Sequence, residues 1–232
     1  MKAKKQKKKA SREKWAYERE IARKGVHLLS LSFVLIYLLF AILIGHRIGL
    51  LALAFLLVIL IEFEYVRIEL KKKIPFISMF WWVKRPKEKE RLGAEVFFLI
   101  GSIICLAIFD LRVAVAAIVM TTFGDMAACL IGRKYGYLKV PFLRGKKWEG
   151  VIAELVVDLF VGFLLVRTIA NGTIWWLGGS TMGTPIWGII IPMAIVATTV
   201  ETAIKKLDDN LLVPIFAGFT GQIALMIIGA FF

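Results

Sequence analysis

The stretch HLLSLSFVLIYLLFAILIG, from His27 to Gly45, decides the fold because it contains no Asp, Glu, Lys or Arg. A helix needs roughly 20 apolar residues to cross the hydrocarbon core of a bilayer. Further stretches along the chain approach this length and composition. The predicted spans are His27–Gly45, Ile48–Tyr65, Gly93–Phe109, Arg112–Ile131, Gly150–Ile169, Ile186–Ile204 and Leu211–Phe231. We therefore expect an all-α, polytopic integral membrane protein with about seven transmembrane helices.

The overall composition agrees with a membrane protein. The chain has 232 residues and is 59% hydrophobic, with a mean hydropathy of +0.76. A single soluble core of this size could not bury so much apolar surface. The first apolar stretch is too long for a cleavable signal peptide, and no small-residue cleavage site follows it. We expect the first span to remain in the mature protein.

The basic residues predict how the chain is oriented in the membrane. If the N-terminus is cytoplasmic, all of the 31 Lys and Arg residues except Arg47, Arg112 and Arg167 lie in cytoplasmic segments. Lys and Arg in short loops are the main determinants of orientation. This distribution predicts a cytoplasmic N-terminus and an external C-terminus, and it accounts for the net charge of +14.

The chain divides into a basic cytoplasmic tail, residues 1–19, and a single transmembrane domain, residues 20–232. The larger cytoplasmic loops are expected at about residues 66–91 and 132–149. The Lys-rich run Lys2–Lys9 has no interleaved aromatic residues that could stack on bases. We expect the tail to bind anionic lipid headgroups and not nucleic acid.

Acidic residues within the predicted spans indicate a function, because a carboxylate in hydrocarbon is costly unless it is paired, hydrated or metal-bound. Nearly all of these acids fall in or beside the cytoplasmic half of a span. They are Asp125, Glu149, Glu154, Asp158, Glu201, Asp208 and Asp209. This one-sided distribution favours a site at the cytoplasmic face.

Basic residues and glycines accompany the acids on the same side, in the segments around Lys24, Arg133 and Lys146. Carboxylates hold a hard divalent cation, basic side chains neutralise phosphate, and glycine lets backbone amides approach a phosphate. A magnesium-bound nucleotide requires this combination. Structural alternatives remain open: Glu154 and Asp158 could line a polar seam between helices, Asp125 could be a structural hydrogen-bonding residue, and Asp208–Asn210 could be an ordinary turn.

Four segments on this side carry a family resemblance. They are Arg23–His27 (RKGVH), Phe123–Gly136 (FGDMAACLIGRKYG), Gly145–Gly150 (GKKWEG) and Glu201–Leu211 followed by Pro214. In this order they resemble the family of dolichol kinases, phytol kinases and CTP-dependent diacylglycerol kinases. The resemblance covers about residues 20–220 and identifies residues 20–232 as a transmembrane kinase domain.

The resemblance implies transfer of the γ-phosphate of CTP to the hydroxyl of a membrane alcohol, a dolichol-like polyprenol, on the cytoplasmic side. It also implies Mg²⁺ or another divalent cation as cofactor. The residues implied are Asp125 and Glu149 in catalysis, Arg23, Lys24, Gly124, Gly132, Arg133 and Lys146 in nucleotide binding, and Asp125, Glu201, Asp208 and Asp209 in metal binding. Soluble nucleotide-binding motifs such as G-x-x-x-x-G-K-[ST] do not occur in the sequence.

Three alternatives remain at the level of the sequence. The acceptor could be diacylglycerol, because apolar spans accept prenyl and acyl chains alike. A CTP:lipid cytidylyltransferase would also use CTP in a membrane, but its signature of Lys-Asp followed by Pro-Gly-His-Gly-Gly does not occur. A small cation- or proton-coupled transporter could use Asp125, Glu154 and Asp158 as an ion path. Its acids should lie around the bilayer midplane, whereas these lie towards one face.

Overall fold

A computed structural model describes residues 18, 21–25, 28–69, 91–141, 145–170, 186–204 and 207–231. The basic tail, apart from Glu18, and most of the predicted loop 66–91 lie outside the described residues. The elements in chain order are η1 (Leu29–Leu31), α2 (Ser32–Leu43), α3 (His46–Ile68), α5 (Ala94–Ile108), α6 (Leu111–Lys134), α7 (Trp148–Ala170), α8 (Ile186–Ala203) and α9 (Asp209–Phe231).

These helices confirm the expected all-α membrane fold. Five are long and apolar enough to cross a membrane: Ile21–Leu43, His46–Ile68, Leu111–Lys134, Ile186–Ala203 and Asp209–Gly229. The other two, α5 and α7, differ from these for separate reasons. α5 has 15 residues, which at about 1.5 Å per residue is shorter than a hydrocarbon core of roughly 30 Å. α7 has 23 residues but includes charged side chains such as Glu154 and Asp158.

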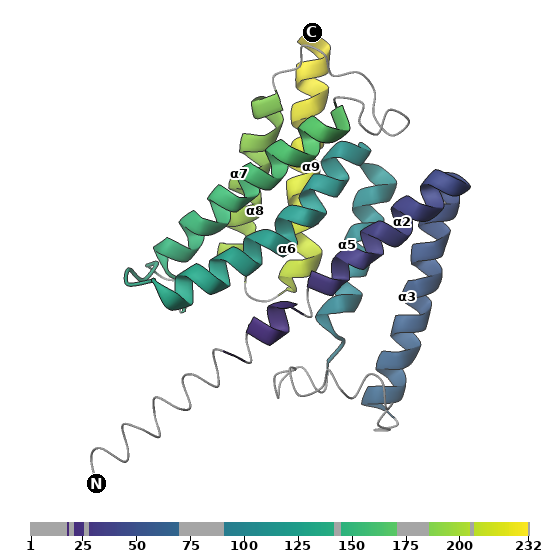
Figure 1. The fold of residues 1–232 in the computed structure, drawn as a ribbon, viewed down its shortest axis with the longest axis horizontal. Coiled ribbons are helices and arrows are strands. Elements are labelled where there is room, and N and C mark those ends of the chain that lie inside the picture. The colour runs from purple at the N-terminus through teal and green to yellow at the C-terminus, as the bar shows by residue number, and fades with distance from the viewer. Residues whose placement is uncertain are drawn as a thin grey trace.

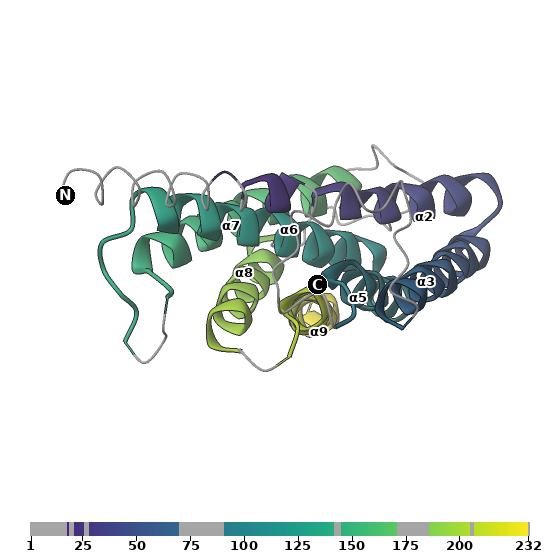
Figure 2. The same cartoon turned by 90° about the horizontal axis from the view of Figure 1, so that it is seen from below.

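Successive helices run in alternating directions and form two layers (Figures 1 and 2). One layer contains α2, α6 and α7, and the other contains α3, α5, α8 and α9. α6 lies at the centre and packs against α5, α7, α8 and α9. Its buried face is rich in small residues, including Ala114, Ala116 and Ala117. Small side chains let neighbouring helix backbones approach closely, as is common in membrane bundles.

α6 and α7 approach one another closely at two glycines, Gly132 near the end of α6 and Gly150 near the start of α7. A Cβ atom on Gly150 would lie 2.8 Å from the carbonyl oxygen of Ala128 and 3.1 Å from the Cα of Gly132. A Cβ atom on Gly132 would lie 3.3 Å from the Cα of Gly150. Glycine at both positions therefore allows the contact that fixes the end of α6 beside the start of α7.

Two helices extend beyond their predicted ends. α3 continues to Ile68, where Glu64 forms an ion pair with Arg67 and accepts a hydrogen bond from the backbone N–H of Gly93 at 2.9 Å. Arg67 also donates to the carbonyl oxygen of Arg91 at 2.6 Å. α6 continues to Lys134, with Arg133 and Lys134 in its last turn, where positive charge interacts favourably with the helix dipole.

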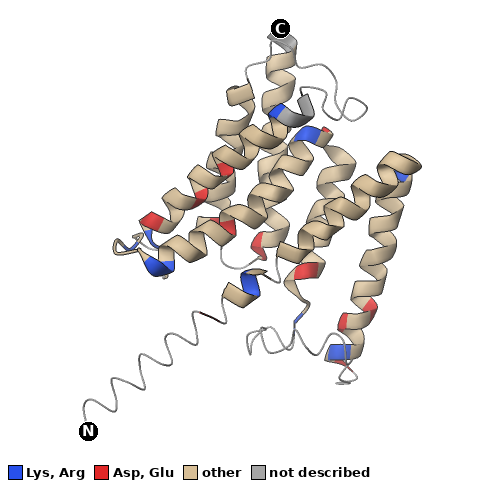
Figure 3. Ribbon diagram, in the orientation of Figure 1, with Lys and Arg blue, Asp and Glu red and all other residues tan. Residues whose placement is uncertain are grey.

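The alternating directions place most of the described charges at one end of the bundle (Figure 3). Arg47 lies at the start of α3, Arg112 at the start of α6 and Arg167 near the end of α7. These three helix ends lie together at the opposite end of the bundle (Figure 1). The separation of charge predicted along the sequence is therefore also a separation in space.

Candidate functional site

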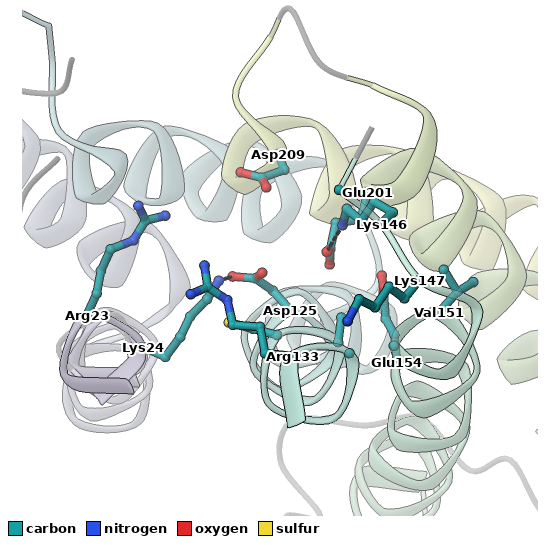
Figure 4. A pocket seen from close by; sticks show the side chains of 15 residues that line it. Arg23, Lys24, Asp125, Arg133, Lys146, Lys147, Val151, Glu154, Glu201 and Asp209 are labelled. Carbon is teal, nitrogen blue, oxygen red and sulfur yellow. Dashed lines mark hydrogen bonds and ion pairs between the residues drawn. The ribbon is translucent and has the colours of Figure 1, made fainter. Parts of the chain in front are cut away.

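A cavity of about 550 Å³ opens at the charged end of the bundle, where α6 and α8 end and α7 and α9 begin (Figure 4). Four segments that are distant in the sequence contribute to its wall. The predicted site residues that line it are Arg23, Lys24, Asp125, Gly132, Arg133, Lys146, Glu201 and Asp209. Ala128, Cys129, Gly145, Lys147, Gly150, Val151 and Glu154 complete the lining. The structure thus brings together most of the residues that the sequence singled out.

The first polar contact in the cavity joins the segment before α2 to α6. The Lys24 ammonium forms an ion pair with Asp125, and the two side chains are 10% and 19% exposed. Asp125 lies about two and a half turns before the end of α6. Arg23 also lines the cavity, next to Lys24 in the chain. Two basic residues at the N-terminal end of the fold therefore lie at the cavity, and Lys24 is paired with a carboxylate on the central helix.

The second polar contact joins the loop before α7 to the end of α8. Lys146 Nζ lies 2.6 Å from Glu201 Oε1, and the Glu201 side chain is only 3% exposed. Burial would by itself lower the pKa of Lys146, but the nearby carboxylates of Glu201, Glu154 and Asp125 outweigh this effect and raise it. Lys146 therefore stays protonated, and it presents a positive charge beside the cavity.

The loop between α6 and α7 is held in a hairpin-like shape. The backbone N–H of Val140 donates to the Lys146 carbonyl at 3.1 Å, and that of Trp148 donates to the Leu138 carbonyl at 2.9 Å. Gly145 has a φ of 91°, in the region where side chains are disfavoured and glycine is not. This turn places Lys146 at the cavity wall.

Glu149 fastens the same loop to the start of α7. Its Oε1 accepts hydrogen bonds from the backbone N–H groups of Tyr137 at 2.8 Å and Leu138 at 3.0 Å. These hydrogen bonds lower the pKa of Glu149. Glu149 is not part of the cavity lining. Its contacts suit a residue that holds the loop in place, while the catalytic role implied by the resemblance stays a prediction.

Two further predicted residues lie beside the cavity without lining it. Gly124 faces α7, where a Cβ atom would lie 2.5 Å from Asp158 Oδ1. Asp208 precedes α9 and accepts hydrogen bonds from the backbone and side-chain nitrogens of Asn210 at 3.1 and 2.8 Å. Burial, together with the neighbouring Asp209, raises the pKa of Asp208. Asp208 thus caps the first turn of α9.

Glu154 is a cavity residue that lies outside the four segments of the family resemblance. It is 1% exposed and lines the cavity from the second turn of α7. Its Oε2 has no hydrogen-bond partner. The only signal in the sequence was its position one turn into a span, on the same side as the other acids.

The cavity is suited to a metal ion only in combination with a ligand. Among the described residues, no group of three or more His, Cys, Asp or Glu is arranged to hold a metal ion. Magnesium is usually held by one or two carboxylates together with substrate phosphates. The carboxylates of Asp125, Glu154, Glu201 and Asp209 line the cavity, so the donor types fit a nucleotide-bound magnesium ion.

Proteins with similar sequences point to one kind of enzyme. A probable chloroplastic phytol kinase of Triticum aestivum is 28% identical over 137 residues, which is 56% of this chain and 43% of the relative. CTP-dependent diacylglycerol kinase 1 of Schizosaccharomyces pombe is 26% identical over 131 residues, 56% of this chain and 60% of the relative. The protein of the same name from Saccharomyces cerevisiae is 28% identical over 145 residues, 60% of this chain and 48% of the relative.

The chain spans about half the length of the curated relatives that it matches. No family model matches it, and no solved structure does. The similar proteins nevertheless confirm the resemblance predicted from the four segments: the curated relatives of this chain are phytol kinases and CTP-dependent diacylglycerol kinases, of the polyprenol and lipid kinase family.

Proposed function

We propose that this protein is a CTP-dependent lipid kinase that phosphorylates the hydroxyl of a membrane polyprenol at the cytoplasmic face. The observation that carries this proposal is the cavity at the charged end of an apolar bundle, where basic side chains from separate segments meet carboxylates. Such a cavity can hold a nucleoside triphosphate at the membrane surface while the apolar chain of the lipid acceptor stays in the bilayer. Relatives named as lipid kinases support the same chemistry.

In the proposed reaction the lipid hydroxyl oxygen bonds to the γ-phosphorus of CTP, the bond from that phosphorus to the β,γ-bridging oxygen breaks, and CDP leaves. Arg23, Lys24, Arg133 and Lys146 would neutralise the phosphate oxygens. Asp125 would accept the hydroxyl proton or hold the metal. Such reactions depend mainly on positioning and charge neutralisation. Magnesium bound with the nucleotide would further neutralise the phosphates, and Asp125, Glu201 and Asp209 are the predicted ligands that line the cavity.

A diacylglycerol kinase is a second candidate, because two of the relatives are named as CTP-dependent diacylglycerol kinases. The two candidates differ in the acceptor alone and share the cavity and the donor. The transporter alternative has less support. Asp125, Glu154 and Glu201 face one cavity at the end of the bundle, whereas Asp158, the deepest acid on α7, does not line it.

The proposed transfer can be tested with CTP labelled at different phosphates. Purified protein in lipid micelles is incubated with Mg²⁺ and a panel containing phytol, a long polyprenol, dolichol and diacylglycerol. We expect γ-label to enter the lipid fraction for a prenol, and α-label to stay in the aqueous fraction, in CDP and unreacted CTP. Entry of α-label into lipid would instead indicate nucleotidyl transfer. Absence of γ-label from every lipid would contradict a kinase with any of these acceptors.

The orientation can be tested with single cysteines in a Cys105→Ala/Cys129→Ala background. Arg47 lies at the end of the bundle opposite the cavity, and Tyr137, which is 87% exposed, lies in the loop beside the cavity. In intact cells we expect an impermeant thiol reagent to modify Arg47→Cys but not Tyr137→Cys. Tyr137→Cys should react once the membrane is permeabilised. The opposite pattern would put the cavity on the outer face and overturn the proposed orientation.

A further inference from the structure

Glu154 is a buried carboxyl group whose bonding capacity is not satisfied by the protein. Its side chain extends from α7 towards Glu201 and Lys146 (Figure 4). Only 1% of the residue is exposed, and Oε2 has no hydrogen-bond partner. A buried polar oxygen without a partner is costly. In native proteins such an atom usually indicates a bound water or ion. Glu154 lines the cavity, so this oxygen can receive a water or an ion from it.

Glu154 also lies against a second buried acid. Glu201, which is 4% exposed, lines the same cavity, and the two carboxylates lie near one another (Figure 4). Two neighbouring carboxylates repel one another unless a proton or a cation lies between them. The nearby ammonium of Lys146 is bonded to Glu201 Oε1, so its positive charge is directed at one member of the pair. The pair can therefore accept further positive charge from the cavity.

Two carboxylates are too few for a site made by the protein alone, in agreement with the absence of a three-residue cluster among the described residues. They are enough for a magnesium ion that keeps water ligands and shares the phosphates of its nucleotide. We propose that Glu154, together with Glu201, holds the divalent cation that enters with the nucleotide. This inference rests on the proposed function and adds a residue that the four segments of the family resemblance do not include.

Asp158 offers a matched comparison one turn deeper on the same helix. It is also 1% exposed, and its Oδ1 also lacks a partner. Its Oδ2 lies 3.4 Å from the Thr198 hydroxyl, it packs against Gly124, and it does not line the cavity. If burial of an acid were the whole effect, substitutions at Glu154 and Asp158 would behave alike. A cation site in the cavity requires that they differ.

The experiment measures CTP affinity with and without metal, in the absence of lipid acceptor. The purified protein is dialysed against α-labelled CTP in EDTA and in Mg²⁺. We expect Mg²⁺ to tighten CTP binding by wild type. In Glu154→Gln, the ratio of CTP affinity in Mg²⁺ to that in EDTA should be at least about tenfold smaller. Its metal-free affinity should stay the same or improve, because a negative charge near the phosphates is removed. Asp158→Asn should keep the full gain.

The possible outcomes separate the two proposals. If the wild type binds CTP and Mg²⁺ increases the CTP affinity of Glu154→Gln as much as that of wild type, the cation site is wrong while the proposed function stands. If Asp158→Asn loses the gain equally, the effect is one of buried charge and the inference fails. If the wild type binds no CTP under either condition, the proposed function itself fails. Should Glu154→Gln not give monodisperse protein, Glu154→Ala replaces it, and a full Mg²⁺-dependent gain in CTP affinity in that variant contradicts the site.

Discussion

Replacing Asp125 with Asn is expected to lower the rate of phosphoryl transfer by roughly 10²–10⁴ while leaving the fold intact. The substitution keeps the size of the side chain and removes its charge. Asp125 is a carboxylate on the central helix that faces the cavity and pairs with Lys24. Loss of a metal ligand or a proton acceptor at this position would therefore affect the reaction directly. The measurement is the initial rate at saturating CTP, normalised to protein that elutes as a single species in detergent.

Asp110→Asn is the matched control. Asp110 precedes the other end of the same helix and pairs with Arg112 at 2.7 Å. It also accepts the backbone N–H of Arg112 at 3.0 Å, a contact that Asn can preserve. The control thus breaks an Asp ion pair on α6 far from the cavity, and we expect near-normal turnover. If Asp125→Asn also keeps near-normal turnover, the proposed site loses its central residue.

The helix boundaries could be predicted well because the bilayer limits the alternatives. Each span must be apolar and of similar length, so the predicted stretch Ile186–Ile204 differs from α8, Ile186–Ala203, by a single residue. The extension of α3 to Ile68 could not be predicted in this way. Arg67 falls in the predicted loop because it is charged, but in the structure it is neutralised by Glu64, which also binds the start of α5.

The convergence of distant residues on one site was also predictable in part. Because successive spans alternate in direction, the first, third and later odd-numbered spans start on the side where the even-numbered spans end. Residues near those ends therefore had to lie at one face, and they include Lys24, Asp125, Lys146 and Glu201. The pairing of Lys24 with Asp125 and of Lys146 with Glu201 was not predictable. It depends on the lateral order of the helices, which hydropathy does not encode.

Residues next to one another in the sequence can also face different surroundings. Gly124 and Asp125 are neighbours, but successive residues of a helix differ by about 100° in direction. Gly124 therefore contacts α7, while Asp125 faces the cavity. Glu149 likewise bonds the preceding loop while Gly150 contacts α6. A motif can thus locate the site without giving each of its residues the same role.

Lys146→Gln is expected to reduce both stability and activity, and a second substitution should separate these effects. Glu201, which is 3% exposed at its side chain, would lose the partner that lies 2.6 Å away. Removing one partner of a buried ion pair leaves an uncompensated charge and costs about 3 kcal/mol. The phosphates of CTP would lose a cation at the same time. Thermal unfolding in detergent reports the first effect, and the transfer rate at saturating CTP reports the second.

The double variant Lys146→Gln/Glu201→Gln should recover most of the lost stability, because a neutral amide at Glu201 needs no counter-charge. Glu201→Gln alone should also stay folded. We expect both variants to remain at least about 10² slower than wild type, because in the proposed reaction Lys146 and Glu201 contact the nucleotide and its cation as well as each other. If activity returns together with stability in the double variant, the pair is only a structural link between the loop and α8. If it stays lost in a protein as stable as wild type, the residues act directly in the cavity.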